Sequence, residues 1–235
     1  MSALVEINNI CKIYNPGENE VRALDHVSVS IDEGEFVAII GQSGSGKSTL
    51  MNMLGCLDVP TSGEYRLHGQ NVSELTDNEL SDIRNWEIGF IFQGFNLIAN
   101  LTALENVELP LIYRGVPRGE RVRLARTALE KVGLGKRMEH KPAEMSGGQQ
   151  QRVAIARAIA QAPPIILADE PTGNLDSRST EEIMAILQEL YEEGRTVILI
   201  THNNEIADRA KRIIQIKDGK IESDTRGGKA AGTEK

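Results

Sequence analysis

The chain has 235 residues, which is enough for one or two domains with a substantial hydrophobic core. Its formal net charge of −8 argues against bulk binding of nucleic acid, because such binding depends on lysine and arginine neutralising phosphates. No apolar run approaches the ~20 residues of a membrane-spanning helix, and residues 1–6 lack the features of a signal peptide. We therefore expect no nucleic acid partner and no direct membrane insertion, and any membrane link should come through a partner protein.

The two cysteines, Cys11 and Cys56, fall in a predicted strand and a predicted helix without the spacing of metal ligands. Two buried, free thiols in a reducing cytoplasm are therefore expected in place of a disulfide. His26, His68 and His140 lie in strand, turn and loop surroundings, where surface placement is expected.

The N-terminal segment is predicted to form a small β subdomain. The irregular alternation of apolar residues from Val5 to Ile13 predicts an edge strand that ends near Tyr14. A second strand is expected over residues 24–31, and a short one between turns at residues 63–69.

Residues 41–48 follow an apolar run and match the pattern G-x-x-x-x-G-K-[ST] of a nucleotide phosphate loop. A strand that ends in a glycine-rich turn lets backbone N–H groups and the next helix N-terminus surround a polyanion. Lys47 is expected to reach the β- and γ-phosphates, and the Ser48 hydroxyl to bind Mg²⁺. The alternative is a glycine-rich turn with a chance lysine. The predicted ATP-binding residues here are Gly41, Gln42, Ser43, Gly44, Ser45, Gly46, Lys47, Ser48 and Thr49.

The middle of the chain, from about residue 95 to residue 161, is predicted to be mostly helical. Capping-box patterns at Thr76–Glu79 and Thr102–Glu105 predict the starts of two helices. Pro110 should end or kink the second of these, and Pro117 should stand near the start of a third. This segment interrupts a chain in which strands and helices otherwise alternate.

The motif Ser146-Gly147-Gly148-Gln149 leads into a predicted helix and resembles a second anion-binding helix end. If both ends bind ATP and one copy cannot bring them together, two copies must face each other around two ATP molecules. The alternative is an ordinary helix N-cap, which this motif would also form.

Strand and helix alternation resumes with buried strands predicted at residues 164–169 and 196–201. A helix that starts at Ser179 and is capped by Gly194 should separate them.

Asp169 and Glu170 close the first of these strands. Asp169 could hold the Mg²⁺ that Ser48 also contacts, and Glu170 could orient and deprotonate the attacking water. A simple turn would explain Pro171 but not two acids at the end of a buried strand.

The end of the chain is predicted to contain a hairpin that turns at Asp218-Gly219. From about Thr225 onward the sequence is polar and glycine-rich, so a disordered tail is expected over residues 225–235.

Taken in order, these motifs resemble those of the ATPase subunit of ABC transporters over nearly the whole chain. The resemblance implies that Tyr14 stacks on adenine and that Gln93 contacts Mg²⁺ or the attacking water while sensing the membrane partner. It also implies that Asp176 communicates between subunits and that His202 contacts the γ-phosphate. The implied catalytic residues are Glu170, Lys47, His202 and Gln93, and the implied Mg²⁺ ligands are Ser48, Gln93 and Asp169.

The implied fold class is α/β, with a P-loop NTPase core and a mainly parallel sheet, an antiparallel N-terminal β subdomain and an inserted α-helical subdomain. A single ATPase domain is expected over residues 1–224, with the core at about 1–94 and 162–224 and the helical subdomain at about 95–161. Within the family, residues 92–111 resemble the branch that serves macrolide exporters and lipoprotein-releasing systems. Met145 stands where the signature usually has leucine, and Gly94 stands where this branch often has a polar residue.

The predicted function is that of a Mg²⁺-dependent ATPase subunit at the cytoplasmic face of the membrane. It should form a homodimer around two ATP molecules and power export or extraction through a separate integral membrane partner. This partner would contact Phe95, Leu97 and Ile98; the alternative is that the domain itself buries this apolar segment. The alternative is a soluble nucleotide-dependent ABC switch protein not coupled to transport. ABC proteins of DNA repair or translation usually carry two ATPase units or a long coiled-coil insertion, and this sequence has neither.

Overall fold

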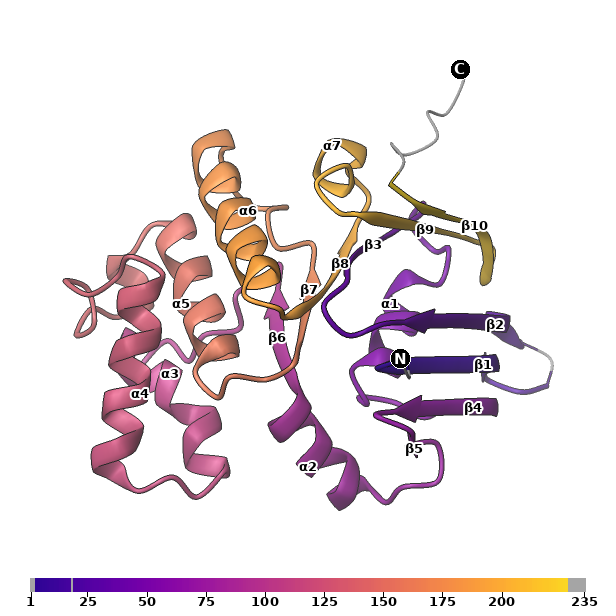
Figure 1. The fold of residues 1–235 in the computed structure, drawn as a ribbon, viewed down its shortest axis with the longest axis horizontal. Helices are drawn as coiled ribbons and strands as arrows, with labels where there is room; N and C mark the ends of the chain where they lie inside the picture. The colour runs from indigo at the N-terminus through magenta and orange to yellow at the C-terminus, as the bar shows by residue number, and fades with distance from the viewer. Residues whose placement is uncertain (1–2, 18, 228–235) are drawn as a thin grey trace. The chain divides into compact units, whose positions relative to one another are not determined.

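The computed structural model describes residues 3–17 and 19–227, so that residues 1 and 2 and residues 228–235 of the predicted tail lie outside the described residues. The chain divides into two compact units, one made of residues 1–82 and 196–235 and the other of residues 83–195. The predicted helical subdomain falls in the second unit, together with strands that were assigned to the core. Figure 1 labels the helices and strands of both units.

The first unit contains an antiparallel sheet with the strand order β2-β1-β4-β5 (Figure 1). Its strands are β1 (Val5–Tyr14), β2 (Val21–Ile31), β4 (Ser62–Leu67) and β5 (Gln70–Asn71). Since β1 pairs with β2 on one side and β4 on the other, its prediction as an edge strand is wrong. The irregular apolar pattern that suggested an edge arises from register shifts along both ladders.

The first unit also contains parallel strands that lead to the phosphate loop. The buried strand β3 (Phe36–Ile40) pairs in parallel with β8 (Thr196–Thr201) and β9 (Arg212–Lys217). Helix α1 (Lys47–Leu54) follows the loop after β3, and the short helix α7 (Asn204–Ala207) follows β8. Strand ends that lie side by side in this way bring the segments after β3 and β8 to the same edge.

The predicted hairpin joins β9 to β10 (Lys220–Arg226), which pair antiparallel. Asp218 and Gly219 have φ values of 49° and 75°, the left-handed pair that a tight hairpin turn requires. Strand β10 continues through Thr225 and Arg226, so the prediction of disorder is wrong for these two residues.

The second unit is built on two parallel strands and a group of helices. Strand β6 (Ile88–Phe92) pairs with β7 (Ile165–Asp169), and α2 (Asp77–Glu87) precedes β6 along the chain. The remaining elements are α3 (Ala103–Tyr113), α4 (Arg118–Lys131), a short 3₁₀ helix (Pro142–Glu144), α5 (Gly147–Ile159) and α6 (Ser177–Glu192). The helices α3, α4 and α5 pack against one another (Figure 1).

The starts of α3 and α4 agree with the predicted caps, whereas the end of α3 does not. Thr102 and Glu105 form the predicted capping box, and Pro117 is the N-cap of α4 as expected. Pro110 does not end α3, which continues to Tyr113 with the proline inside it. Because no backbone N–H is present at Pro110, the helix passes through that position without one of its regular bonds.

None of the helices in the described part of the chain is long and apolar enough to cross a membrane. The two cysteines are free and buried, as predicted.

Candidate nucleotide-binding and catalytic site

The residues predicted for the site occur in both units, and each group is considered within its own unit. The first unit holds Tyr14, the phosphate loop and His202. The second holds Gln93, the Ser146 motif, Asp169, Glu170 and Asp176.

The phosphate loop has the backbone geometry that a bound polyanion needs. Gly44 and Gly46 have φ values of 78° and 104°, which side-chain-bearing residues rarely adopt. A Cβ atom on Gly46 would lie 2.5 Å from the Ala23 carbonyl oxygen, so this position also needs glycine for space. Gly46 stands directly before α1, whose N-terminus therefore faces the loop.

Two side chains of the loop are arranged to interact with an anion. Lys47 Nζ donates to the Gly41 carbonyl at 2.7 Å and to the Gln42 carbonyl at 2.8 Å, so its charge lies over the loop. The Ser45 hydroxyl is buried and has no hydrogen-bond partner in the described part of the chain. A buried hydroxyl normally finds a partner, and a phosphate oxygen would supply one. The residues present therefore fit a nucleotide phosphate group.

Tyr14 ends β1 and is half-buried in the same unit as the loop. Its hydroxyl donates to Asp58 Oδ2 at 3.1 Å, and Lys12 Nζ lies 5.1 Å from the ring centre. Burial raises the pKa of Tyr14, as does Asp58, whereas the Thr49 hydroxyl acts in the opposite direction. Tyr14 is thus held beside α1 with its hydroxyl bonded to Asp58, so that the aromatic ring is the part of the side chain left to contact a ligand.

His202 follows the last residue of β8 and is exposed. The next residue, Asn203, caps α7 by accepting hydrogen bonds from the backbone of Glu205 and Ile206. The imidazole therefore stands on a short turn at the carboxyl end of a buried strand, the edge where ligands bind in open α/β sheets.

In the second unit, Asp169 is the last residue of β7 and Glu170 directly follows it. Both are half-buried, in contrast to the four buried residues that precede them. Glu170 has a φ of 44°, an uncommon value for a residue with a side chain. Its carbonyl accepts from the Gly173 N–H at 3.0 Å, which closes a turn after the strand.

Gln93 follows β6 and is joined to the turn after Glu170 by two hydrogen bonds. Gln93 Nε2 donates to Asn174 Oδ1 at 3.2 Å, and Asn174 Nδ2 donates to the Gln93 carbonyl at 3.2 Å. A Cβ atom on Gly173 would lie 2.8 Å from Gln93 Nε2, so the glycine makes room for the glutamine. The role of Asn174 as the partner of Gln93 was not predicted, because nothing in the spacing of the two residues indicates it.

The signature motif begins α5. Ser146 is the N-cap, and its hydroxyl accepts from the Gln149 N–H in a capping box. Gly148 is buried, and a Cβ atom there would lie 2.5 Å from Ser179 Oγ. Packing against α6 therefore explains Gly148, whereas Gly147 has more room.

Asp176 has a structural role that the sequence prediction missed. It caps α6, which begins at Ser177 and not at Ser179, and its carboxylate accepts from the Ser179 N–H at 2.8 Å. This hydrogen bond is the main reason that the pKa of Asp176 lies below its usual value. An acid three residues before Ser179 was the signal for this cap.

A phosphate loop between a buried strand and a helix, with a capped glycine-rich helix end elsewhere in the chain, defines a nucleotide-binding protein of the phosphate-loop class. Residues 24–173 match the family model described as "ABC transporter". Because that match covers more than half of the chain, the chain belongs to the ABC transporter family. This match confirms the family that the motifs predicted.

The curated relatives differ in how much of their length is matched. The chain is 55% identical to the macrolide export ATP-binding/permease protein MacB of Hyphomonas neptunium, with 98% of this chain and 36% of the relative covered. It thus spans about a third of the length of that relative. An uncharacterised ABC transporter ATP-binding protein of Thermotoga maritima is 54% identical, with 97% of each chain covered.

Among solved structures, the chain is similar to the ATP-binding cassette MJ0796 in a dimeric post-hydrolysis state bound to ADP and Pi. The TM-score is 0.88 at 49% identity, and 95% of this chain and 99% of the other are covered. This structural similarity confirms the predicted fold class.

Proposed function

We propose that this chain is the ATPase subunit of an export or extraction system, working at the cytoplasmic face of a membrane as an ATP-bound homodimer. The observation that carries the proposal is the phosphate loop. It has left-handed glycines, the Lys47 ammonium lies over its carbonyls, and the Ser45 hydroxyl has no hydrogen-bond partner among residues 3–17 and 19–227. The dimeric form of MJ0796 and the ATP-binding/permease description of MacB support the quaternary part of the proposal.

The proposed roles follow from the chemistry of each side chain. Lys47 binds the phosphates and offsets charge that develops on them during hydrolysis. Ser48, Asp169 and Gln93 carry the oxygen donors that Mg²⁺ prefers, so we assign the metal to them. The bound Mg²⁺ would neutralise phosphate charge.

Glu170 is the proposed general base, and His202 is proposed to contact the γ-phosphate. Both residues follow the carboxyl end of a buried parallel strand. The left-handed backbone at Glu170 supports a functional constraint at this position, because such strain persists where the surroundings enforce it.

The second copy is proposed to contribute Ser146, Gly147, Gly148 and Gln149 to the ATP of the first. The capped N-terminus of α5 offers backbone N–H groups and the positive end of a helix dipole to an anion. Asp176, which follows the Asn174 partner of Gln93, is proposed to transmit changes at one nucleotide to the facing subunit.

The test of this proposal is the variant Glu170→Gln. The amide keeps the size of the side chain but cannot accept the proton, so hydrolysis should fall by about 10²-fold or more while ATP still binds. Gel filtration with ATP should then show a lasting dimer. Glu189→Gln, which changes an exposed carboxylate on α6, is the matched control and should hydrolyse ATP normally. A Glu170→Gln variant with normal turnover, or one that stays monomeric with ATP, would contradict the proposal.

A membrane partner is proposed to bind the segment that follows Gln93. Phe95 and Leu97 are half-buried and Ile98 is 48% exposed, so the segment is not covered by its own unit. Ile98→Asp should therefore leave basal ATP hydrolysis intact but abolish assembly with the partner or transport. Normal assembly and transport by this variant would rule out docking at Ile98.

A further inference from the structure

A β-bulge between β1 and β2 brings together three residues whose side chains bind metals. Ile10 pairs with Val27 and Lys12 pairs with Leu24, so that the single residue between them faces two residues of β2. The single residue is Cys11, and the two that face it are Asp25 and His26.

The bulge changes the direction of the side chains on β2. Neighbouring side chains of a regular strand point to opposite faces, so Asp25 and His26 could not both approach Cys11 in a regular ladder. His26 has a φ of 53°, the left-handed value that accompanies the bulge. The Asp25 N–H donates to the Gly219 carbonyl at 2.8 Å, which ties the bulge to the turn between β9 and β10.

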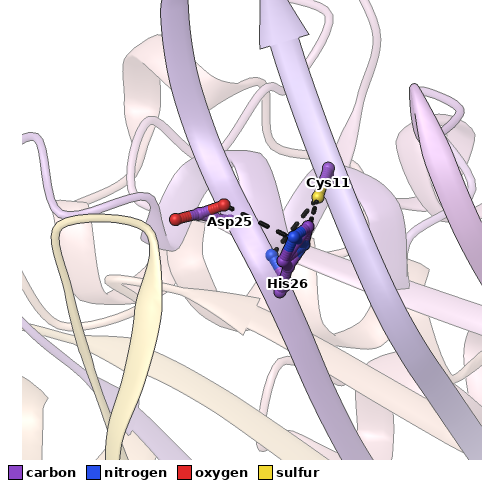
Figure 2. A group of neighbouring side chains, drawn as sticks. All are labelled: Cys11, Asp25 and His26. Carbon is purple, nitrogen blue, oxygen red and sulfur yellow. Dashed lines mark hydrogen bonds and ion pairs between the residues drawn. The ribbon is translucent and has the colours of Figure 1, made fainter.

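The donor atoms of the three side chains converge, as Figure 2 shows. Cys11 Sγ lies 3.0 Å from His26 Nδ1 and accepts a hydrogen bond from the His26 backbone N–H at 3.3 Å. His26 Nδ1 lies 3.9 Å from Asp25 Oδ1. One ligand atom from each residue can be chosen so that all lie within 4.8 Å of one another.

These separations are close to those around a single zinc ion. With Zn–S of about 2.3 Å and Zn–N or Zn–O of about 2.0 Å, the donors of a tetrahedral site are roughly 3.3–3.6 Å apart. The Sγ–Nδ1 separation of 3.0 Å is slightly too short, and the Nδ1–Oδ1 separation of 3.9 Å is slightly too long. Moving the His26 ring by about half an ångström would bring both into that range. The His26 side chain is 61% exposed, which provides an entry path for the ion and room for a water molecule as fourth ligand.

Two basic residues already pair with the Asp25 carboxylate. The Asp25 carboxylate pairs with Lys220 Nζ at 3.0 Å and with Arg22 Nη1 at 3.3 Å. Lys220 contacts Oδ2. Lys220 can keep Oδ2 in place while Oδ1 binds a metal, and the exposed Arg22 would have to turn away. At Cys11, the backbone N–H of His26 donates to Sγ and holds the sulfur beside the imidazole.

We propose that Cys11, Asp25 and His26 form a binding site for a thiophilic divalent cation of the zinc class, through Sγ, Oδ1 and Nδ1. Sulfur and nitrogen donors select such a cation over Mg²⁺, which prefers oxygen ligands. The site is therefore chemically distinct from the proposed Mg²⁺ site of ATP hydrolysis. A cation bound here would join β1 to β2 and should stabilise the folded chain by mass action.

The experiment is a titration of the reduced full-length chain with Co²⁺, used as a spectroscopic probe for Zn²⁺. One equivalent should produce a thiolate-to-cobalt charge-transfer band and the strong visible bands of tetrahedral coordination. Zn²⁺ should remove both, whereas excess Mg²⁺ should not. His26→Asn should weaken Co²⁺ binding by more than ~10-fold, and asparagine tolerates the left-handed backbone at this position. Cys11→Ser should abolish the charge-transfer band.

Two matched controls separate these residues from similar ones. His68→Asn changes another exposed histidine with a left-handed φ of 49°, and Cys56→Ala removes the other buried thiol. Both controls should bind Co²⁺ as the parent chain does. The proposal is overturned if the parent chain shows no charge-transfer band, if His26→Asn binds Co²⁺ as tightly as the parent chain, or if Cys56→Ala loses the band. Because His26 is exposed, its variant decides the question even if Cys11→Ser does not fold.

Discussion

Replacing Arg157 by methionine should loosen the loop after Gln93 more than it destabilises the whole chain. Arg157 lies on α5 and donates to the Phe95 carbonyl at 2.9 Å and to the Asn96 carbonyl at 2.5 Å. Burial lowers the pKa of Arg157, yet an arginine remains charged. Phe95 and Asn96 have φ values of 60° and 50°, so this guanidinium holds two consecutive residues in a left-handed conformation.

The expected magnitude comes from two opposing contributions. A hydrogen bond from a charged donor contributes about 1.5–3 kcal/mol, and the exposed Asn96 carbonyl can turn to water instead, so the two bonds together contribute roughly 3–4 kcal/mol. The left-handed conformation costs about 1–2 kcal/mol per residue, which is recovered when the loop relaxes. The free energy of unfolding of Arg157→Met should therefore fall by no more than about 1–2 kcal/mol.

Urea unfolding and amide hydrogen exchange measure the two effects separately. Exchange in residues 93–98 should become at least ~10-fold faster, because the loop opens locally without unfolding of the core. Arg126→Met, which removes an exposed arginine from α4, should leave the exchange of these residues unchanged. The reasoning is refuted if Arg157→Met exchanges like the parent chain in this loop, or if it loses more than about 4 kcal/mol of stability.

Three further predictions test single features of the first unit. Tyr14→Ala should weaken ATP binding by about 1–3 kcal/mol in equilibrium titrations, the contribution of base–aromatic stacking, and an unchanged affinity would assign the ring to packing alone. Gly46→Ala should lower the free energy of unfolding, measured with urea, by about 1–3 kcal/mol, because the φ of Gly46 is 104° and the Ala23 carbonyl is close. Gly44→Ala should lower it by less, because the space around Gly44 is open. Arg212 holds the pKa of Asp224 below its usual value, so the stability that this carboxylate contributes is present above its unfolded pKa, near 3.8, and is lost as the pH falls through the folded pKa. The free energy of unfolding of Asp224→Asn should accordingly depend less on pH, below about pH 5, than that of the parent chain.

Local sequence patterns predicted those elements whose ends are decided by neighbouring residues. The capping boxes at Thr76 and Thr102 form as expected, since each needs only a hydroxyl and a glutamate three residues later. The hairpin at Asp218-Gly219 forms for the same local reason. The start of α6 was misplaced because two acceptable caps, Asp176 and Ser179, stand three residues apart, and the structure uses the first.

Features that depend on pairing between strands could not be predicted in this way. The position of β1 inside its sheet follows from β4, which joins it from more than 45 residues away. The contact between Cys11 and His26 follows from a bulge, and the spacing of 15 residues between them resembles no metal motif. The turn that joins Asn174 to Gln93 likewise depends on the parallel pairing of β6 with β7.

In the second unit, the left-handed residues Phe95, Asn96 and Glu170 lie in the turns after β6 and β7, whereas Ala162 lies before β7. Strand β6 is followed within three residues by the left-handed Phe95, and β7 is followed at once by the left-handed Glu170. The strands themselves are well buried, whereas the two turns are held by hydrogen bonds such as those between Gln93 and Asn174. Stability and proposed activity therefore depend on different contacts in this unit. Substitutions that keep the strands but break the turn contacts should alter the rate of hydrolysis before they alter the fold.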